Sequence, residues 1–368
     1  IWSPMTSHVG TIKAAEGMVN SIRKYNSNEK IFLLNVFGEF NFLKGKEGFN
    51  LLNIFNKFKF YKTGIISRFL IYFFTILSIP HLIYFVYKYK PKIIFTCLVG
   101  YIPCLLKVLF KNLKVINSIQ GYPKINFFRK ILWNFTYKKS DCLITMTNIT
   151  KNYFIKNFKL NENKIIKIDN PIISRKIKTL SLENIDTQDQ KIFEKKVFCS
   201  IGRLTRQKNY FELIKGFEIF SKNYDKKYNL IILGDGEEKD ALKKYIEIKN
   251  IKNCFLLGFK QNPYRYLSRS SLYISSSLWE EPGHTLIEAG YLNIPILSSD
   301  CPNGPKELIK HNLNGFKYEM KNFKDLEKKL IDINNINEKK LFKVKFKMKK
   351  TISSFTEFQF AKKINTYL

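Results

Sequence analysis

Residues 278–307 read LWEEPGHTLIEAGYLNIPILSSDCPNGPKE and place two carboxylates, Glu280 and Glu288, eight positions apart around a Pro-Gly turn. The turn at Pro282 and Gly283 lets the backbone approach a ligand closely, because glycine has no side chain. A helix is predicted to begin there, and the first amides of a helix lack an intrahelical acceptor, so they attract phosphate. These amides belong to Gly283, His284, Thr285 and Leu286. The stretch therefore predicts an anion-binding helix start with a carboxylate on either side of it.

The same residues resemble the retaining glycosyltransferases of family four. The likeness lies in the Glu-x7-Glu spacing, the small pair Ala289-Gly290 and the strand start Ile294-Pro295-Ile296, followed by DCPNGPKE at 300–307. The resemblance implies an α/β fold of the GT-B type, in which two Rossmann-like domains face a cleft and a C-terminal helix returns to the N-terminal domain. The run at 300–307 is similar to that of bacterial members that build surface polysaccharides such as lipopolysaccharide or capsule.

For the two carboxylates, the resemblance implies separate tasks on one nucleotide-sugar donor. Glu288 would accept hydrogen bonds from the ribose hydroxyls, and Glu280 would approach the transferred sugar and support an oxocarbenium-like transition state. Glu281 competes with Glu280, and only the eight-residue spacing favours Glu280. The helix dipole alone also favours carboxylates near a helix start, so the joint occurrence of the motifs carries the assignment.

Two cations follow the predicted strand 197–201. Arg203 comes directly after Gly202 and lies 77 residues before Glu280, and Lys208 follows five positions later. A departing diphosphate develops negative charge, so cations aimed at it would stabilise the transition state more than the ground state. The alternative for Arg203 is an ordinary pair with a surface carboxylate.

Glycine turns complete the predicted donor site. Gly234 ends a strand in LGDGE, near the nucleotide base by resemblance, and the backbone at Gly258 would frame the base pocket. Gly10, in the sequence SHVGT, would let the backbone meet the donor phosphates. Such turns also join strands to helices without any ligand, so each one alone is weak evidence.

On the acceptor side the sequence departs from the family. Many relatives carry a histidine where this chain has Gln120, and glutamine cannot relay a proton, so it could only hydrogen-bond the sugar or the acceptor. The family implies that the leaving phosphate can take the acceptor proton instead. His8 is a possible acceptor-side base, or simply a polar loop residue.

Apolar and amphipathic segments alternate along the chain and predict parallel sheets wound on both faces, twice over. Strands are expected near 31–36, 92–96, 114–118, 142–146, 197–201, 230–233, 254–257, 272–275 and 294–298, and helices near 12–25, 210–223 and 237–249. A polar stretch at 180–196 marks the boundary region. We expect an N-terminal acceptor domain over residues 1–172, a C-terminal donor domain over 173–352, and a last helix over 353–368 that packs back on the N-terminal domain.

Charge and apolar patterning indicate an anionic partner. The formal net charge is +33, and residues 1–180 carry 29 basic against 7 acidic side chains. Such a field favours nucleic acid, an anionic membrane surface or a phosphate-bearing substrate, although a general lysine bias accounts for part of it. Residues 65–86 are about long enough to span a bilayer, but Arg68, Pro80 and His81 argue for helices packed on the N-terminal sheet. Their outer face would be either a membrane-binding surface ringed by lysines or an ordinary buried one.

The sequence gives no sign of a cofactor or a resident metal. It has no Asp-x-Asp, no Cys-x-x-Cys and no histidine cluster, so Arg203, Lys208 and helix amides are expected to supply the positive charge. Six scattered cysteines fit a reducing cytoplasm, and no signal peptide is visible.

These features predict a metal-independent glycosyltransferase on the inner face of the cytoplasmic membrane. It would move a hexose or N-acetylhexosamine from a UDP-sugar to a lipid-linked or surface glycan, without a nucleic-acid partner. Two alternatives stay open, a basic nucleic-acid-binding protein and a nucleotide-sugar epimerase or hydrolase of the same fold.

Overall fold

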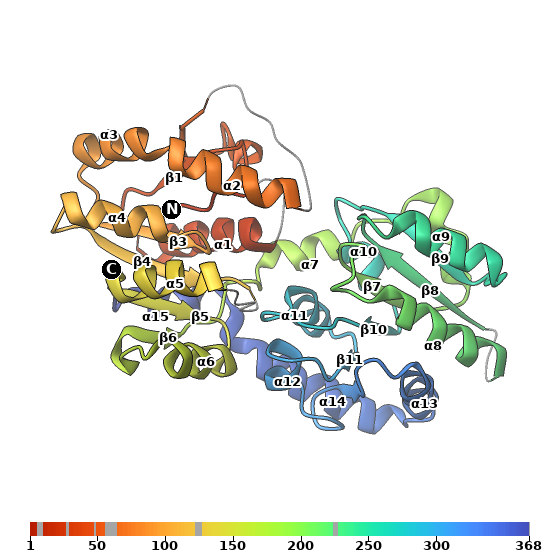
Figure 1. Cartoon of the computed structure of the whole chain (residues 1–368). Coiled ribbons are helices and arrows are strands. Elements are labelled where there is room, and N and C mark those ends of the chain that lie inside the picture. The colour runs from red at the N-terminus through yellow and green to blue at the C-terminus, as the bar shows by residue number, and fades with distance from the viewer. Residues whose placement is uncertain are drawn as a thin grey trace. The chain divides into compact units, whose positions relative to one another are not determined.

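The computed structural model describes residues 1–5, 10–26, 29–47, 49–55, 65–121, 127–223 and 227–367, with the backbone alone at 65–68. The chain forms two compact units, labelled by element in Figure 1. Unit 1 comprises Ile1–Pro171 and Thr356–Leu368, and unit 2 comprises Ile172–Phe355. The domain limits expected from the sequence were 172/173 and 352/353.

Unit 1 is built on parallel strands. They are β1 (Phe32–Asn35), β2 (Asn50–Asn53), β3 (Ile93–Cys97), β4 (Lys114–Ile119), β5 (Cys142–Thr145) and β6 (Ile165–Lys167). β3 to β6 pair in sequence order, and β2 pairs with β1. Trp2 joins the two groups because it bridges both Leu34 and Thr96 in parallel. The first residues of the chain therefore lie in the middle of the sheet, between β1 and β3.

Helices cover both faces of this sheet. They are α1 (Gly10–Tyr25), α2 (Ile65–Leu77), α3 (Ile79–Tyr89), α4 (Tyr101–Leu109), α5 (Phe127–Lys139), α6 (Asn148–Phe158) and α15 (Glu357–Ile364). α1 and α15 pack with Phe95 and Ile116 in one core. Because side chains alternate along a strand, Ile94 and Val115 face the other way, where they pack with α2, α3 and α4. The predicted return of the C-terminal helix to the N-terminal domain is confirmed.

The apolar segment 65–86 forms two helices, as the position of Pro80 predicts. α2 ends at Leu77 and α3 begins at Ile79, with Pro80 in its first turn. Phe74, Leu82 and Phe85 point into the core of unit 1. Among the described residues no single helix is long and apolar enough to cross a membrane. Residues 69–77 and α3 pass such a test only as a pair, which is bent by 48°.

Unit 2 contains a second parallel sheet. Its strands are β7 (Lys196–Ile201), β8 (Tyr228–Leu233), β9 (Cys254–Gly258), β10 (Leu272–Ser275), β11 (Ile296–Ser299) and β12 (Phe316–Tyr318), in the order β12-β11-β10-β7-β8-β9. Each strand that was predicted from the sequence is present, which confirms that part of the prediction. β2, β6 and β12, with three or four residues each, escaped it.

Two layers of helices enclose the sheet of unit 2. They are α7 (Arg175–Ser181), α8 (Tyr210–Asn223), α9 (Lys239–Ile248), α10 (Tyr264–Leu267), α11 (His284–Tyr291), α12 (Gly304–Leu308), α13 (Phe323–Asn334) and α14 (Glu338–Thr351). One core contains side chains from α7, α10 and α11, and the other contains side chains from α8 and α13. Both units are thus doubly wound α/β folds.

Candidate active site

The candidate site of unit 2 lies where the strand order reverses. β7 is followed by β8 on one side, whereas β10 pairs with β7 on the other side. In doubly wound sheets, ligands bind outside the carboxyl ends of the strands at such a point. Two loops meet there, the β7 loop (residues 202–209) and the β10 loop (residues 276–283). They are joined by hydrogen bonds from Leu278 N to Gln207 O (2.8 Å), from Gln207 Nε2 to Trp279 O (2.9 Å) and from Ser276 Oγ to Lys208 O (2.7 Å).

Glu280 ends up buried between these loops with a cation beside it. The residue is only 8% exposed. Its Oε1 atom accepts hydrogen bonds from Lys208 Nζ at 2.5 Å and from Ser277 Oγ at 2.6 Å. The two residues that the sequence assigned to sugar and phosphate are therefore paired with each other. The carboxylate of Glu280 is compensated, which is what burial of a charge requires.

Glu281, the competitor of Glu280, points elsewhere. Its Oε2 atom accepts a hydrogen bond from Asn303 Nδ2 at 2.5 Å, just before α12. The backbone of Glu280 is also tied to that region, since Gly304 N donates to Glu280 O at 3.1 Å. A side chain at Gly304 would place its Cβ 1.8 Å from Pro282 O, so glycine is required there. The geometry separates the two neighbouring carboxylates, and Lys208 approaches Glu280.

Glu288 lies in α11, 5% exposed, as the fifth residue of that helix. Its Oε1 atom accepts a hydrogen bond from Tyr264 Oη at 2.8 Å. Tyr264 is the first residue of α10, which follows β9. No sequence motif marks Tyr264, and only the fold brings it to Glu288.

The start of α11 has the predicted glycine geometry. Gly283 has φ +98°, in the left-handed region that favours glycine. His284 and Thr285 follow, both half-buried, and Thr285 Oγ1 accepts a hydrogen bond from Tyr273 Oη at 2.5 Å. The Leu286 amide was predicted to be available for phosphate, but it already donates to Gly283 O at 3.1 Å. The Leu286 amide is therefore not part of the predicted anion site.

The remaining donor-side glycines pack backbone against backbone. Gly234 has φ +152°, and a Cβ there would lie 1.8 Å from Gly202 O. Gly234 N donates to Gly258 O at 2.8 Å, so the ends of β8 and β9 are also connected. Gly258 has φ +71° and open space around its Cβ position. Arg203 projects from this region as an exposed side chain.

Two buried groups near Glu280, the Tyr273 phenol and the Cys301 thiol, are neutral. Burial raises the pKa of the Tyr273 phenol well above its ordinary value. Burial also raises the pKa of the Cys301 thiol to about 12, so both groups stay uncharged at neutral pH. Within the described ranges no group of three or more His, Cys, Asp or Glu side chains gathers as metal ligands do.

The acceptor-side predictions fall in unit 1. His8 lies outside the described residues, and Gly10 is the exposed first residue of α1. Gln120 is buried and forms a reciprocal pair with Asn170: Asn170 Nδ2 donates to Gln120 Oε1 at 2.7 Å, and Gln120 Nε2 donates to Asn170 Oδ1 at 3.1 Å. Gln120 Nε2 also donates to Ser118 Oγ at 2.6 Å. The Gln120 side-chain amide thus connects the end of β4 to Asn170, near the end of the first segment of unit 1 (Ile1–Pro171).

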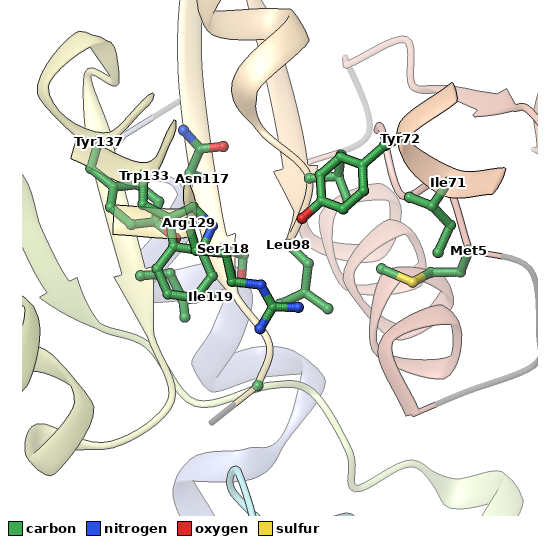
Figure 2. A pocket seen from close by; sticks show the side chains of 12 residues that line it. Met5, Ile71, Tyr72, Leu98, Asn117, Ser118, Ile119, Arg129, Trp133 and Tyr137 are labelled. Carbon is green, nitrogen blue, oxygen red and sulfur yellow. The ribbon is translucent and has the colours of Figure 1, made fainter. Parts of the chain in front are cut away.

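Unit 1 has its own cavity, of 280 Å³, at the equivalent reversal of strand order. Met5 follows the central Ile1–Trp2 segment, Leu98 follows β3 and Gly121 follows β4. Figure 2 shows Trp133, Tyr137 and Arg129 on one side, across from Tyr72, Ile71 and Met5. Sequence reasoning did not find this site. Its signal was the aromatic and basic run FFRKILWNFTYKK of α5.

Comparison with known proteins finds a family model that is similar to the second unit. Residues 183–345 match the family model described as glycosyl transferases group 1. This match spans most of unit 2 and less than half of the whole chain. The match includes every candidate residue between Gly202 and Glu288.

Curated relatives of the chain are named as glycosyltransferases. An uncharacterized glycosyltransferase of Methanocaldococcus jannaschii is 37% identical over 245 residues, which is 62% of this chain and 60% of the relative. A second relative, from Campylobacter jejuni, is 28% identical over 205 residues, which is 55% of this chain and 53% of the relative. It is named N-acetylgalactosamine-N,N'-diacetylbacillosaminyl-diphospho-undecaprenol 4-alpha-N-acetylgalactosaminyltransferase. The chain thus spans only about half to three fifths of these relatives.

Solved structures show that the fold extends over the whole chain. A glycosyltransferase of Rickettsia africae aligns with a TM-score of 0.79 and 16% identity, over 99% of this chain and 95% of that one. HepE of Anabaena, solved with UDP, aligns with a TM-score of 0.76 and 13% identity, over 100% and 98%. The predicted GT-B fold is confirmed.

Proposed function

We propose that the protein is a retaining glycosyltransferase of family four that moves a hexose or N-acetylhexosamine from a UDP-sugar to a lipid-linked or surface glycan. The observation that carries this proposal is the arrangement of two buried carboxylates, Glu280 and Glu288, on either side of the α11 start, with Lys208 on Glu280. Two similarities support it. HepE shares the fold and was solved with UDP, and the Campylobacter relative is named for transfer to a diphospho-undecaprenol acceptor.

The donor would lie along the carboxyl ends of β7, β8 and β10. Glu288 has one oxygen held by Tyr264, and its carboxylate can accept further hydrogen bonds from ribose hydroxyls. The diphosphate would meet the amides of Gly283, His284 and Thr285 at the start of α11. Gly202 and Gly234 pack backbone against backbone, so neither puts a side chain into the space proposed for the donor.

The Lys208–Glu280 pair links donor binding to chemistry. A bound diphosphate gives Lys208 a second anionic partner, and the exposed Arg203 side chain can reach the same charge. Glu280 would then lie beside the sugar carbon that becomes positive in the transition state. The bond from that carbon to the leaving phosphate oxygen breaks, the bond to the acceptor oxygen forms, and the acceptor proton passes to the leaving phosphate on the same face.

In this proposal the positive charge comes from Arg203, Lys208 and helix amides, and the reaction needs no metal ion. Preorganised cations and amides can stabilise a developing diphosphate charge without one. Transfer that persists in EDTA is the expected outcome.

We further propose that the protein works at the inner face of the cytoplasmic membrane. α2 carries an outward apolar row at helical spacing, made of Phe69, Phe73, Ile76 and Leu77. Exposed apolar rows of this kind mark interaction surfaces, and lysines near them would be drawn to anionic lipid. This surface would hold the enzyme on the bilayer that contains its acceptor.

A thermal-shift panel tests the donor assignment. UDP, GDP, ADP and their sugars would be compared with and without EDTA, because a ligand at ~100 times its Kd stabilises the folded state by ~2.7 kcal/mol. A shift with uridine nucleotides that EDTA leaves unchanged is expected. No shift with any nucleotide would overturn the proposal and turn attention to nucleic acid as the partner of the basic surface. Turnover of UDP-sugar at the same rate without acceptor would indicate a hydrolase or epimerase instead.

A further inference from the structure

Residues 48–140 contain 15 lysines and arginines and not one aspartate or glutamate. This stretch includes α2, α3, α4 and α5 of unit 1. Elsewhere in the chain the two signs are mixed, as the total of 30 acidic residues shows. A surface of a single sign over so long a stretch attracts anions from a distance.

The cavity of unit 1 lies within this stretch and has one cation in its wall. Of the twelve described residues that line it, Arg129 alone is charged, and its guanidinium lies 6.0 Å from the ring centre of Trp133. Two polar neighbours, Asn117 and Ser118, take part in hydrogen bonds of the fold. Asn117 Nδ2 is within 3.5 Å of Cys104 Sγ and also bonds Ser140, while Ser118 Oγ accepts from Gln120. Arg129 is therefore the group in this wall that suits a phosphate.

The two helices that wall the cavity also carry apolar side chains outward. α2 contributes Tyr72 to the cavity and exposes Phe69 and Phe73. α5 contributes Arg129 and Trp133 to the cavity, and it exposes Phe127, Phe128, Ile131 and Phe135. Phe128 is 79% exposed, which is unusual for so large an apolar side chain next to a basic cavity.

The size of the cavity decides which part of a ligand it can hold. Sites for drug-sized ligands measure ~300–1,000 Å³, so a cavity of 280 Å³, just below that range, has the size of a head group. A chain attached to that head group would have to lie outside, over the exposed rows of α2 and α5.

We infer that this cavity binds the phosphate-bearing head of an amphiphilic acceptor, with Arg129 on the phosphate and the lipid chain along the exposed rows of α2 and α5. The inference rests on the proposed function, since it names the acceptor class for that reaction. It goes beyond it by assigning a site and a recognition group in unit 1. The ligand is an anionic phospholipid-like acceptor, in which the phosphate joins the sugar to the apolar chain.

A binding experiment tests this without any transfer reaction. Trp133 lines the cavity, so its fluorescence reports occupancy, and Trp133→Phe identifies its contribution among the three tryptophans. The probes are farnesyl diphosphate, farnesol and inorganic pyrophosphate, each titrated with UDP present to occupy the donor site. Farnesyl diphosphate should change the Trp133 signal saturably, and it should bind at least about tenfold more tightly than either half alone.

Matched variants on α5 locate the phosphate. Arg129→Gln should weaken farnesyl diphosphate binding by about tenfold or more, because a hydrogen bond to a charged group is lost. Lys130→Gln removes the adjacent exposed cation, which does not line the cavity, and should change binding by less than about threefold. Phe128→Ser should weaken farnesyl diphosphate while leaving pyrophosphate unchanged.

Three results would overturn the inference. Equal losses for Arg129→Gln and Lys130→Gln would mean a diffuse electrostatic attraction. Equal affinity for pyrophosphate and farnesyl diphosphate would mean a free-phosphate site. Binding of farnesyl diphosphate that is seen only when UDP is left out would place it in unit 2. If unit 2 fails to bind nucleotides while this binding persists, the proposed reaction fails and the lipid-phosphate site stands.

Discussion

In unit 2 the loops after β7 and β10 gather charged side chains, whereas in unit 1 the loops at the equivalent reversal of strand order line a mostly apolar cavity. The two sheets place their sites by the same topological rule. They differ in how charge is handled. Unit 2 buries carboxylates and compensates them with Lys208, Ser277 and Tyr264, while unit 1 offers Arg129 in a stretch without any carboxylate.

In the proposed function, this difference lets one architecture serve two substrates. A compensated polar site suits a soluble, highly charged donor that must be oriented atom by atom. An apolar cavity with one cation, walled by helices that expose aromatic rows, suits an amphiphile. This comparison fails if charged and apolar side chains can be exchanged between the two sites without an effect on binding or turnover.

The largest effect is expected at Glu280. Glu280→Gln keeps the shape and removes the negative charge, so turnover should fall by ~10²–10³-fold, as for other preorganised electrostatic groups. UDP affinity, measured by calorimetry, should change by no more than about threefold, because the charge acts in the transition state.

Glu281→Gln is the matched control for that change. Its carboxylate contacts Asn303, so turnover should stay near that of the unaltered protein. A larger loss for Glu281→Gln than for Glu280→Gln would exchange the assignments of the two neighbours.

Glu288→Ala should come next, with an effect on donor affinity. Loss of a charged hydrogen bond costs ~1.5–3 kcal/mol, which corresponds to roughly a ten- to 150-fold weaker Kd for UDP. Tyr264→Phe, which removes one hydroxyl and leaves the carboxylate in place, should give a smaller loss. Unchanged UDP affinity in Glu288→Ala would remove Glu288 from the site.

A smaller effect is expected on membrane binding when the α2 row is made polar. Phe69→Ser, Phe73→Ser and Ile76→Ser together should weaken sedimentation with phosphatidylglycerol vesicles by about tenfold, since shallow insertion of the three side chains gives only a small part of the ~1.5–3 kcal/mol that full burial of each would give. Both the unaltered protein and the variant should bind neutral phosphatidylcholine vesicles weakly, and the variant should keep its affinity for UDP.

The control variants for the membrane test lie in unit 2. Leu182→Ser and Ile248→Ser change exposed apolar side chains there and should leave vesicle binding unaltered. A loss in Phe342→Ser and Phe346→Ser, which alter exposed aromatics of α14, with none in the α2 variant would move the membrane contact to unit 2.

The sequence predicted most of the architecture because parallel strands read as apolar runs of four to six residues between amphipathic helices. β12 and β6 were missed because three residues carry no period. The positions of Gly283 and Gly234 were predictable, since turns with positive φ require glycine.

Side-chain partners were not predictable in the same way. Lys208 and Glu280 are 72 positions apart, and their contact depends on how the β7 and β10 loops are joined. Gln120 fell in a family motif position, but its partner Asn170 lies 50 residues away. The cavity of unit 1 could not be predicted for the same reason, because its walls come from α2, α5 and the ends of two strands.

The smallest effect concerns the support of the unit 2 site. Asp186 accepts hydrogen bonds from Lys260 Nζ at 2.8 Å and from Tyr266 Oη at 2.7 Å, and it also pairs with Arg265. These contacts hold residues near 186 to α10, the helix that carries Tyr264. Asp186→Asn should therefore lower the free energy of unfolding, measured in urea at pH 7, by at most about 1 kcal/mol for so exposed a side chain.

The pH dependence of this loss follows from the sign of the shift. The hydrogen bond from Lys260 lowers the pKa of Asp186 from 3.8 to about 2, so the unfolded chain takes up the proton first as the pH falls. The stabilisation is present above pH 3.8 and is lost between there and about pH 2, and over that range Asp186→Asn and the unaltered protein should converge. Glu247→Gln, which removes the exposed pair with Lys243, should show almost no loss at any pH. A gap between Asp186→Asn and the unaltered protein that stays constant down to pH 2 would mean that packing, and not the charge of Asp186, supports α10.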